Sequence, residues 1–216
     1  MSEAGPGDVA ARRAELANAV DGVRARLTEA NDAREIALPA CRRAIRASGS
    51  SIRAVHRRET ERARELAAEA VEALREAQEA LAPHPAVAHA GFLHDAEREV
   101  AEAHLTAALV SGAPLPGPTE LGIDGAPWLK ALAEAASELR RYTLDRLREG
   151  DLEQGEALLG AMDDAYDVLV TVDFPDAITE GLRRTVDALR AVLERTRGDV
   201  TATVVQARLQ RAIEGR

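Results

Sequence analysis

Apolar residues recur at intervals of three or four along most of this chain, which is the spacing of one face of an α-helix. Strong helix formers, chiefly Ala, Leu, Glu and Arg, fill the positions between them. No stretch keeps the period-2 alternation of a half-buried strand, and no longer internal repeat is visible. The pattern therefore predicts an all-α fold, a single-domain bundle of about seven helices.

Capping and turn residues suggest where these helices begin and end. Asn31 and Asp32 are good N-cap residues, and Glu35 follows Asp32 by three positions, which predicts a helix start here. Pro39 and Gly49 are weak points inside the helix that follows. A short segment is expected at residues 119–123. The expected helices are residues 8–28, 32–81, 86–110, 127–148, 152–172, 177–197 and 200–213.

Composition narrows the architecture. Aromatic residues make up only 2% of the chain, so the core must be built from small aliphatic side chains, which suit closely packed helices. No Gly/Ser/Pro-rich linker divides the 216 residues, so we expect one helical domain at residues 8–214 after a disordered N-terminus at residues 1–7. No window approaches the ~20 apolar residues of a membrane span, and no apolar signal core is present, so a cytoplasmic location without membrane contact is expected.

Charge and cysteine content exclude some functions. The net charge of −9 does not favour nucleic-acid binding through overall charge, because phosphate attraction needs basic surface. Lysine occurs only at Lys130, so nearly all positive charge is arginine. The single cysteine, Cys41, excludes an intrachain disulfide and a cysteine-rich zinc site.

Basic residues form one stripe on the expected second helix. Arg42, Arg46, Arg53 and Arg57 are separated by four, seven and four positions, and Arg64 follows after seven more, so all would share one face. Such a stripe can be a solvated face with local ion pairs, or it can bind a phosphate backbone. The sequence lacks aromatic residues for base stacking here, so binding would have little sequence preference.

Two pairs of carboxylates supply the strongest chemical candidate. Glu99 and Glu102 are three residues apart, and Glu134 and Glu138 are four apart, so each pair lies on one face of a helix. Both pairs fall on polar arcs, where glutamates are usually solvated. If the two helices meet, however, four carboxylates would surround a space suited to a hard divalent cation.

Two other metal-binding patterns do not fit. Ferritin-like di-iron bundles need Glu-x-x-His, and none of the five histidines has a glutamate three positions before it. The all-α nucleoside triphosphate pyrophosphohydrolases need a second Glu-x-x-Asp, but Ser137 stands three residues after Glu134. No glycine-rich phosphate-binding loop occurs either.

Several segments together resemble the translin family, in particular the archaeal-type proteins similar to translin-associated factor X. The resemblance runs in order along residues 8–214 and is clearest at 119–151 and 166–199. The segments that carry it are DARE (32–35), TELGI (119–123), WLKALAEAASELRR (128–141), EGD (149–151), YDVL (166–169), DFPD (173–176), GLRR (181–184) and ERTRGD (194–199).

The resemblance implies a seven-helix fold that assembles into a hollow, barrel-like homo-oligomer, commonly an octamer. Members of the factor X branch are metal-dependent endoribonucleases acting on single-stranded RNA, with carboxylates on the inner wall. The family's Glu-x-x-Glu falls on Glu99 and Glu102, and its Asp-x-x-x-Glu falls on Glu134 and Glu138. Glu134 departs from the usual aspartate, and the extra methylene moves its oxygens by about 1 Å, a shift that matters for catalysis.

The resulting hypothesis is a Mg²⁺- or Mn²⁺-dependent endoribonuclease for single-stranded RNA. The four glutamates would hold the metal, and Arg42, Arg46, Arg53 and Arg57 would hold the RNA backbone. Two alternatives stay open: a non-catalytic oligomer that binds RNA or single-stranded DNA, as in the translin branch, which lacks the acidic set, and a helical protein-interaction scaffold.

Overall fold

The structure, a computed structural model, describes residues 6–89 and 91–214. Within these residues it contains helices and connecting turns but no strand, which confirms the predicted all-α class. Most of the expected disordered N-terminus, residues 1–5, lies outside the described residues. The helices are α1 (Pro6–His56), α2 (Thr60–Leu81), α3 (Pro85–Ala88), α4 (Phe92–Ser111), α5 (Pro118–Leu121), α6 (Gly125–Arg148), α7 (Leu152–Leu169), α8 (Asp176–Thr179) and α9 (Leu182–Glu214).

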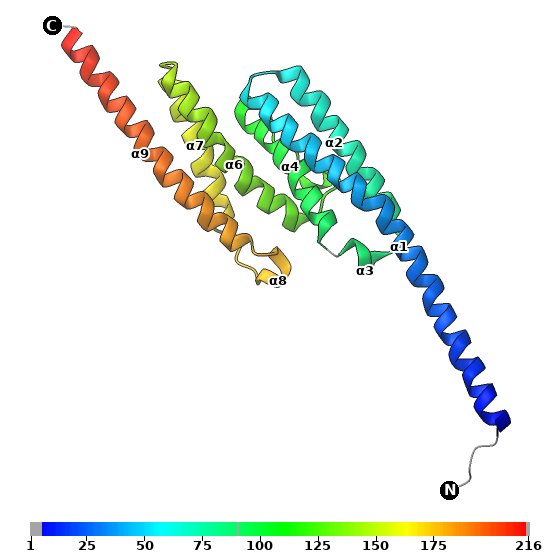
Figure 1. The fold of residues 1–216 in the computed structure, drawn as a ribbon. Helices are drawn as coiled ribbons and strands as arrows, with labels where there is room; N and C mark the ends of the chain where they lie inside the picture. Colours follow the sequence, from blue (N-terminus) through cyan, green and yellow to red (C-terminus); the bar gives the residue numbers. More distant parts are fainter. Residues whose placement is uncertain (1–5, 90, 215–216) are drawn as a thin grey trace.

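The long helices lie side by side as a bundle (Figure 1). Helix α1 packs on α2 and α4, α4 packs on α6, and α6 packs on α7 and α9. Helices α4 and α6 are therefore the central pair of the bundle. No helix among the described residues is both long enough and apolar enough to cross a membrane.

Alanines make the helix contacts close. Ala40 and Ala44 of α1 and Ala70 and Ala77 of α2 are completely buried, so the two helices meet through methyl groups. Gly155 of α7 serves the same purpose against α6, because a Cβ there would lie only 2.7 Å from the Cδ2 atom of Leu147. The low aromatic content thus has the predicted consequence of a tightly spaced helical core.

The N-terminal half of α1 projects beyond the bundle, and the C-terminal end of α9 projects at the opposite side (Figure 1). Both projections carry exposed apolar side chains at helical spacing. On α1 these are Leu16, Val20, Val23 and Leu27, and on α9 they are Val205, Leu209 and Ile213. Exposed apolar stripes of this kind are typical of surfaces that bind another chain.

The predicted break near Asn31 was wrong, because α1 continues through it to His56. The real break follows at Arg58, which adopts a left-handed conformation with φ 62°. The amide of Arg58 donates to the carbonyl of Val55, and the amide of Glu59 donates to that of Ala54, which together form a Schellman C-cap. Glycine normally occupies the left-handed position of this cap, so a break at an arginine was not visible in the sequence.

Other boundaries also differ from the predicted ones. The helix expected at 86–110 is divided into α3 and α4 by Gly91, whose φ is 95°. The helix expected to start at 177 begins instead at Leu182, because Glu180 and Gly181 are both left-handed. The break expected at Gly198 does not occur, since buried Val200 and its neighbours continue the packing of α9 on the bundle.

Candidate functional site

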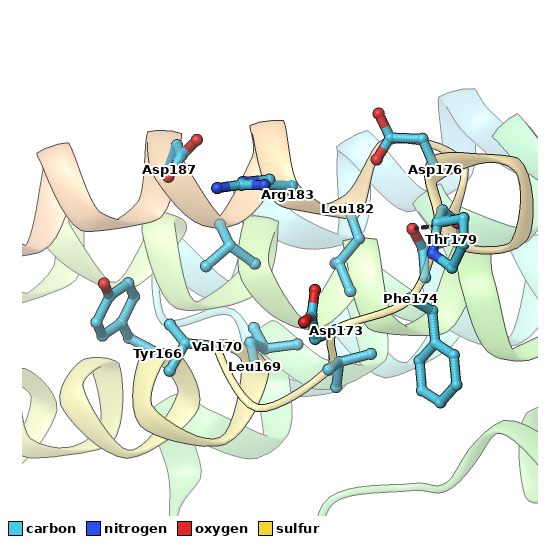
Figure 2. Close-up of a pocket in the computed structure, with 13 residues that line it drawn as sticks. Tyr166, Leu169, Val170, Asp173, Phe174, Asp176, Thr179, Leu182, Arg183 and Asp187 are labelled. Carbon is cyan, nitrogen blue, oxygen red and sulfur yellow. Dashed lines mark hydrogen bonds between the residues drawn. The ribbon is translucent and has the colours of Figure 1, made fainter.

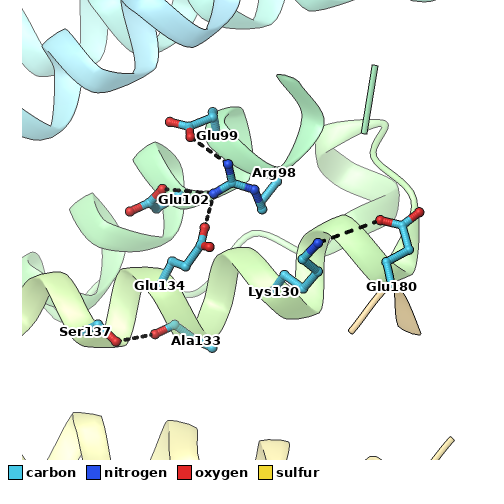
Figure 3. A network of polar contacts seen from close by, with 8 residues as sticks. All are labelled: Arg98, Glu99, Glu102, Lys130, Ala133, Glu134, Ser137 and Glu180. Atoms are coloured by element: carbon cyan, nitrogen blue, oxygen red, sulfur yellow. Dashed lines mark hydrogen bonds and ion pairs between the residues drawn. The ribbon is translucent and has the colours of Figure 1, made fainter. Parts of the chain in front are cut away.

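The four predicted glutamates come together between the two central helices. Glu99 and Glu102 lie on α4, and Glu134 and Glu138 lie on α6. Figure 3 shows Glu99, Glu102 and Glu134 directed toward one guanidinium group, that of Arg98 on α4. The polar arcs of the two helices therefore face each other, with Glu102 buried and the other three glutamates partly exposed.

Arg98 is the centre of this cluster. Its Nη2 atom lies 2.8 Å from Oε1 of Glu99, its Nη1 atom lies 3.9 Å from Oε2 of Glu102, and Nη1 also pairs with Glu134. Burial disfavours the charged guanidinium, but the nearby glutamates, led by Glu134, more than offset this and raise the pKa of Arg98. One positive charge thus serves three carboxylates, which leaves the cluster with excess negative charge.

The excess negative charge has its largest effect on the pKa of Glu102. Its side chain is buried, and burial together with repulsion from Glu134, Glu99 and Glu138 raises its pKa to about 8. A carboxyl group with this pKa is mostly protonated at neutral pH. A cation that entered the cluster would favour its ionised form, which is the behaviour expected of a metal ligand.

Glu138 has a partner that the sequence did not suggest. Nε2 of His56, at the C-terminal end of α1, lies 2.8 Å from Oε2 of Glu138. This hydrogen bond is the main reason that the pKa of Glu138 is lowered. The His56 side chain is only 4% exposed, so it fixes one orientation of the Glu138 carboxylate.

The donor set suits a hard divalent cation, because every candidate ligand is a carboxylate oxygen. The spacing is looser than in a preformed site. Among the described residues, three potential ligand atoms from different side chains lie within 4.8 Å of one another at His94, Glu97 and Asp124, not at the four glutamates. A metal at the glutamates would compete with Arg98 for their oxygens.

Comparison with known proteins places this arrangement in a family. The fold matches AfC3PO in complex with duplex RNA, with a TM-score of 0.80 and 34% identity over 88% of this chain and 98% of that one. A second AfC3PO crystal structure matches with a TM-score of 0.81 and 33% identity over the same shares of the two chains. The chain belongs to the translin family.

Two further matches are weaker. Apo-NeC3PO shares the fold, with a TM-score of 0.76 over 85% of this chain and 96% of that one, at 17% identity. An uncharacterised protein of Methanocaldococcus jannaschii is 28% identical over 121 residues, which are 56% of this chain and 54% of the relative, so the match spans about half of each. No protein-family model matches the chain.

The predicted arginine stripe is only partly continuous in this translin-family chain. Arg42, Arg46 and Arg53 are exposed on α1, whereas Arg57 lies in the turn after α1. Arg64 lies on α2, so the expectation that it shares the helix of the others was wrong.

The arginines also differ in their partners. Arg57 makes two hydrogen bonds to Glu59, of 2.7 and 2.8 Å, and Arg53 donates to the hydroxyl of Ser50 at 2.9 Å. Within the described residues, Arg42 and Arg46 make no ion pair or side-chain hydrogen bond. They are therefore the members of the stripe most available to a phosphate.

A cavity of about 860 Å³ lies away from the glutamates, between the end of α7 and the start of α9 (Figure 2). Aspartates at 173, 176 and 187 and Arg183 line it together with apolar side chains. None of the predicted site residues contributes to this cavity.

Sequence reasoning missed Arg98 and His56. Arg98 is adjacent to Glu99 in sequence, so a charge count around the doublet would have found it. Nothing local indicates His56, because its partner Glu138 is 82 positions away.

Proposed function

We propose that this translin-family protein is a Mg²⁺- or Mn²⁺-dependent endoribonuclease that acts on single-stranded RNA. The observation that carries the proposal is the convergence of four carboxylates from α4 and α6, with Glu102 buried and its pKa raised to about 8. Buried carboxylates with strongly raised pKa values occur preferentially at functional sites. RNA is the proposed substrate because AfC3PO, to which this chain is 34% identical, has been solved with duplex RNA.

In this proposal Glu99, Glu102, Glu134 and Glu138 hold the metal. When bound, the metal supplies Lewis-acid stabilisation of the scissile phosphate and an activated water molecule. His56 keeps the Glu138 carboxylate in place through its 2.8 Å hydrogen bond. Arg98 pairs with Glu99 and Glu134 when no other cation is present, so metal binding has to compete with existing ion pairs.

Arg42, Arg46, Arg53 and Arg57 are proposed to contact the RNA backbone. Arginine donates to phosphate in a bidentate geometry, and all four side chains are exposed. Arg42 and Arg46 would contribute most, because Arg57 first has to leave Glu59. Contacts to the backbone alone would also accept single-stranded DNA, so discrimination against DNA would have to come from the cleavage step.

The active form is proposed to be a hollow homo-oligomer, most simply an octamer. The support for assembly is the exposed apolar stripe on the projecting part of α1, where Leu16 and Leu27 are 62% and 65% exposed. A second copy would remove this surface from water. Light scattering after chromatography gives the mass directly, and a monomer that is unchanged by Leu16→Glu would contradict this part of the proposal.

The nuclease proposal is tested by the variant Glu138→Ala, assayed on end-labelled single-stranded RNA with Mn²⁺. We expect cleavage to be abolished while the oligomer mass and the melting temperature change little. The matched control is Glu79→Ala, an exposed glutamate of α2, which should cut at the wild-type rate. Undiminished cleavage by Glu138→Ala would remove Glu138 from the site.

A specific observation supports a second candidate, a non-catalytic RNA-binding oligomer. Arg98 already pairs with the glutamates, and the tightest group of potential ligand atoms lies elsewhere in the described chain. In that case Arg98 would be a permanent structural counter-ion. RNA binding that depends on salt, without metal-dependent product bands, would establish this second function.

A further inference from the structure

A second group of ionisable side chains meets near the start of α4, away from the four glutamates. His94 and Glu97 lie three residues apart on α4, Asp124 immediately precedes α6, and Glu180 immediately follows α8. Potential ligand atoms of His94, Glu97 and Asp124 all lie within 4.8 Å of one another. Residues from distant parts of the chain thus form one compact nitrogen and oxygen donor set.

The imidazole of His94 is held in an orientation suited to metal binding. Its Nδ1 atom pairs with Oε1 of Glu180, and its Nε2 atom lies 3.5 Å from Oδ2 of Asp124. A carboxylate on Nδ1 keeps the proton on that nitrogen and leaves the Nε2 lone pair for a cation. Glu180 itself is fixed by a left-handed backbone with φ 53° and by an ion pair at 4.0 Å to Lys130, shown in Figure 3.

Glu97 is buried, and its two carboxylate oxygens differ in their hydrogen bonding. The residue is only 4% exposed, and its Oε1 atom accepts a hydrogen bond of 2.9 Å from Nε2 of Gln78. Its Oε2 atom is buried and has no hydrogen-bond partner. A buried carboxylate oxygen is normally paired, so an unpaired one on a side chain that groups with His94 and Asp124 indicates an unfilled interaction.

Asp124 occupies the N-cap position of α6 without capping the helix. It is the N-cap residue of α6, where aspartate usually accepts a hydrogen bond from the helix, yet its side chain makes no capping bond. Instead the carboxylate lies toward His94, and its side chain is 69% exposed. The group therefore has a buried side at Glu97 and an open side at Asp124, through which a hydrated ion can enter.

We propose that Nε2 of His94 and the carboxylates of Glu97 and Asp124 bind one divalent transition-metal ion of the zinc type. Two carboxylates and a neutral imidazole balance the ion's charge, and the open side leaves room for water as a further ligand. The imidazole nitrogen favours Zn²⁺ or Co²⁺ over Mg²⁺ and Ca²⁺, which prefer oxygen ligands only.

The ion would fasten the start of α6 to α4. It uses none of the four glutamates, and the inference does not depend on nuclease activity. The alternative is that no metal ion binds and that a protonated His94 forms ion pairs with Asp124 and Glu180.

The test uses the full chain, stripped with EDTA, desalted and titrated with Co²⁺ in excess Mg²⁺ so that the four glutamates are occupied. Co²⁺ bound to nitrogen and oxygen ligands in a low-symmetry site gives a visible absorption band, and Zn²⁺ should displace it. We expect one Co²⁺ per chain in the wild type. In both His94→Ala and Glu97→Gln the band should be lost or the affinity should fall by about tenfold or more.

The matched control is His89→Ala, because the His89 ring lies 6.0 Å from that of His94 and is outside the ligand set. This variant should bind Co²⁺ as the wild type does. Asp124→Asn changes an exposed side chain and should keep the fold, as circular dichroism can check, while weakening the band. No band in the wild type, or an unchanged band and affinity in folded His94→Ala, would overturn the proposal.

Discussion

Two carboxylate clusters share helix α4, and they differ in what balances their charge. Around Glu99, Glu102 and Glu134 the balancing group is Arg98, a cation from the protein itself. Around Glu97 no arginine takes part, and one buried oxygen has no partner. The first cluster already contains a cation, which a metal ion would have to displace, whereas the second contains a buried oxygen that has no hydrogen-bond partner.

The two clusters should select different metal ions because their ligand atoms differ. The first cluster offers carboxylate oxygens alone, which suits Mg²⁺ or Mn²⁺. The second offers an imidazole nitrogen as well, which suits Zn²⁺. Each cluster should therefore respond to its own cation, and variants at one should leave the other unchanged.

The largest expected effect comes from removing the protein cation of the first cluster. Arg98→Ala leaves three carboxylates near one another without a counter-charge, so we expect a loss of about 3 kcal/mol in the free energy of unfolding at neutral pH in EDTA. Mg²⁺ should restore part of this loss, and urea unfolding with and without Mg²⁺ measures it. Co²⁺ binding at the second cluster should be unchanged.

The matched control is Arg75→Ala, which breaks an exposed pair with Glu72 and should cost less than about 1 kcal/mol. Equal losses for the two arginine variants would show that Arg98 is an ordinary surface arginine, which contradicts the account.

The next effect is the pH dependence of stability due to Glu102. The folded protein keeps the Glu102 proton up to a pKa of about 8, whereas the unfolded chain releases it near the ordinary value of 4.5. The folded state therefore binds more protons between these values, and the free energy of unfolding falls as pH rises through that window, by about 1.4 kcal/mol for each unit of pKa difference.

Glu102→Gln should remove this slope and be more stable relative to the wild type at pH ~9 than at pH ~5, as unfolding across pH would show. Burial also raises the pKa of Glu97, so Glu97→Gln should change the slope in the same direction. Mg²⁺ should reduce the pH dependence of stability that is due to Glu102 and leave the part due to Glu97 unchanged. A wild-type slope that Glu102→Gln leaves intact would refute this assignment.

A smaller effect is expected at His56, which orients Glu138 without reaching the centre of the cluster. His56→Ala should raise the Mn²⁺ concentration needed for half-maximal RNA cleavage by roughly 10–100-fold, because groups that hold a metal ligand in place have effects of this size. The maximal rate at saturating Mn²⁺ should change less. His104→Ala is a comparable variant of a half-buried histidine, and an equal shift there would mean that the effect is not specific to Glu138.

The smallest effects are expected at the arginine stripe. Arg42→Ala and Arg46→Ala should each weaken RNA binding and reduce the slope of log affinity against log salt by about 0.7, the value for one phosphate contact on a single strand. Arg43→Ala is the neighbouring control, because Arg43 already pairs with Glu76. Fluorescence anisotropy over a salt series measures the slopes, and equal changes for Arg43 and Arg46 would argue against a defined stripe.

The sequence predicted those features that depend on local spacing. The doublets Glu99–Glu102 and Glu134–Glu138 follow from helix periodicity, and the all-α class follows from the apolar pattern and the alanine-rich composition. The family assignment needed only the order of short segments along the chain.

Features that depend on distant contacts were not predictable in the same way. His56 meets Glu138 across 82 positions of the chain, and the end of α1 just after His56 is at a left-handed arginine, Arg58, which nothing in the sequence marks as a glycine would. The second cluster needs the turn before α6 and the turn after α8 to come to the same end of α4. Spacing along the sequence therefore does not connect His94 with Asp124 and Glu180.

An RNA cleavage assay would show whether the first cluster is a metal-dependent nuclease site. End-labelled single-stranded RNA is incubated with the wild type and with Glu99→Ala, each with Mn²⁺, with Mg²⁺ and with EDTA. We expect product bands from the wild type with either metal, none with EDTA, and none from Glu99→Ala. Cleavage that persists in EDTA or in Glu99→Ala, or RNA that is bound but never cut, would contradict it.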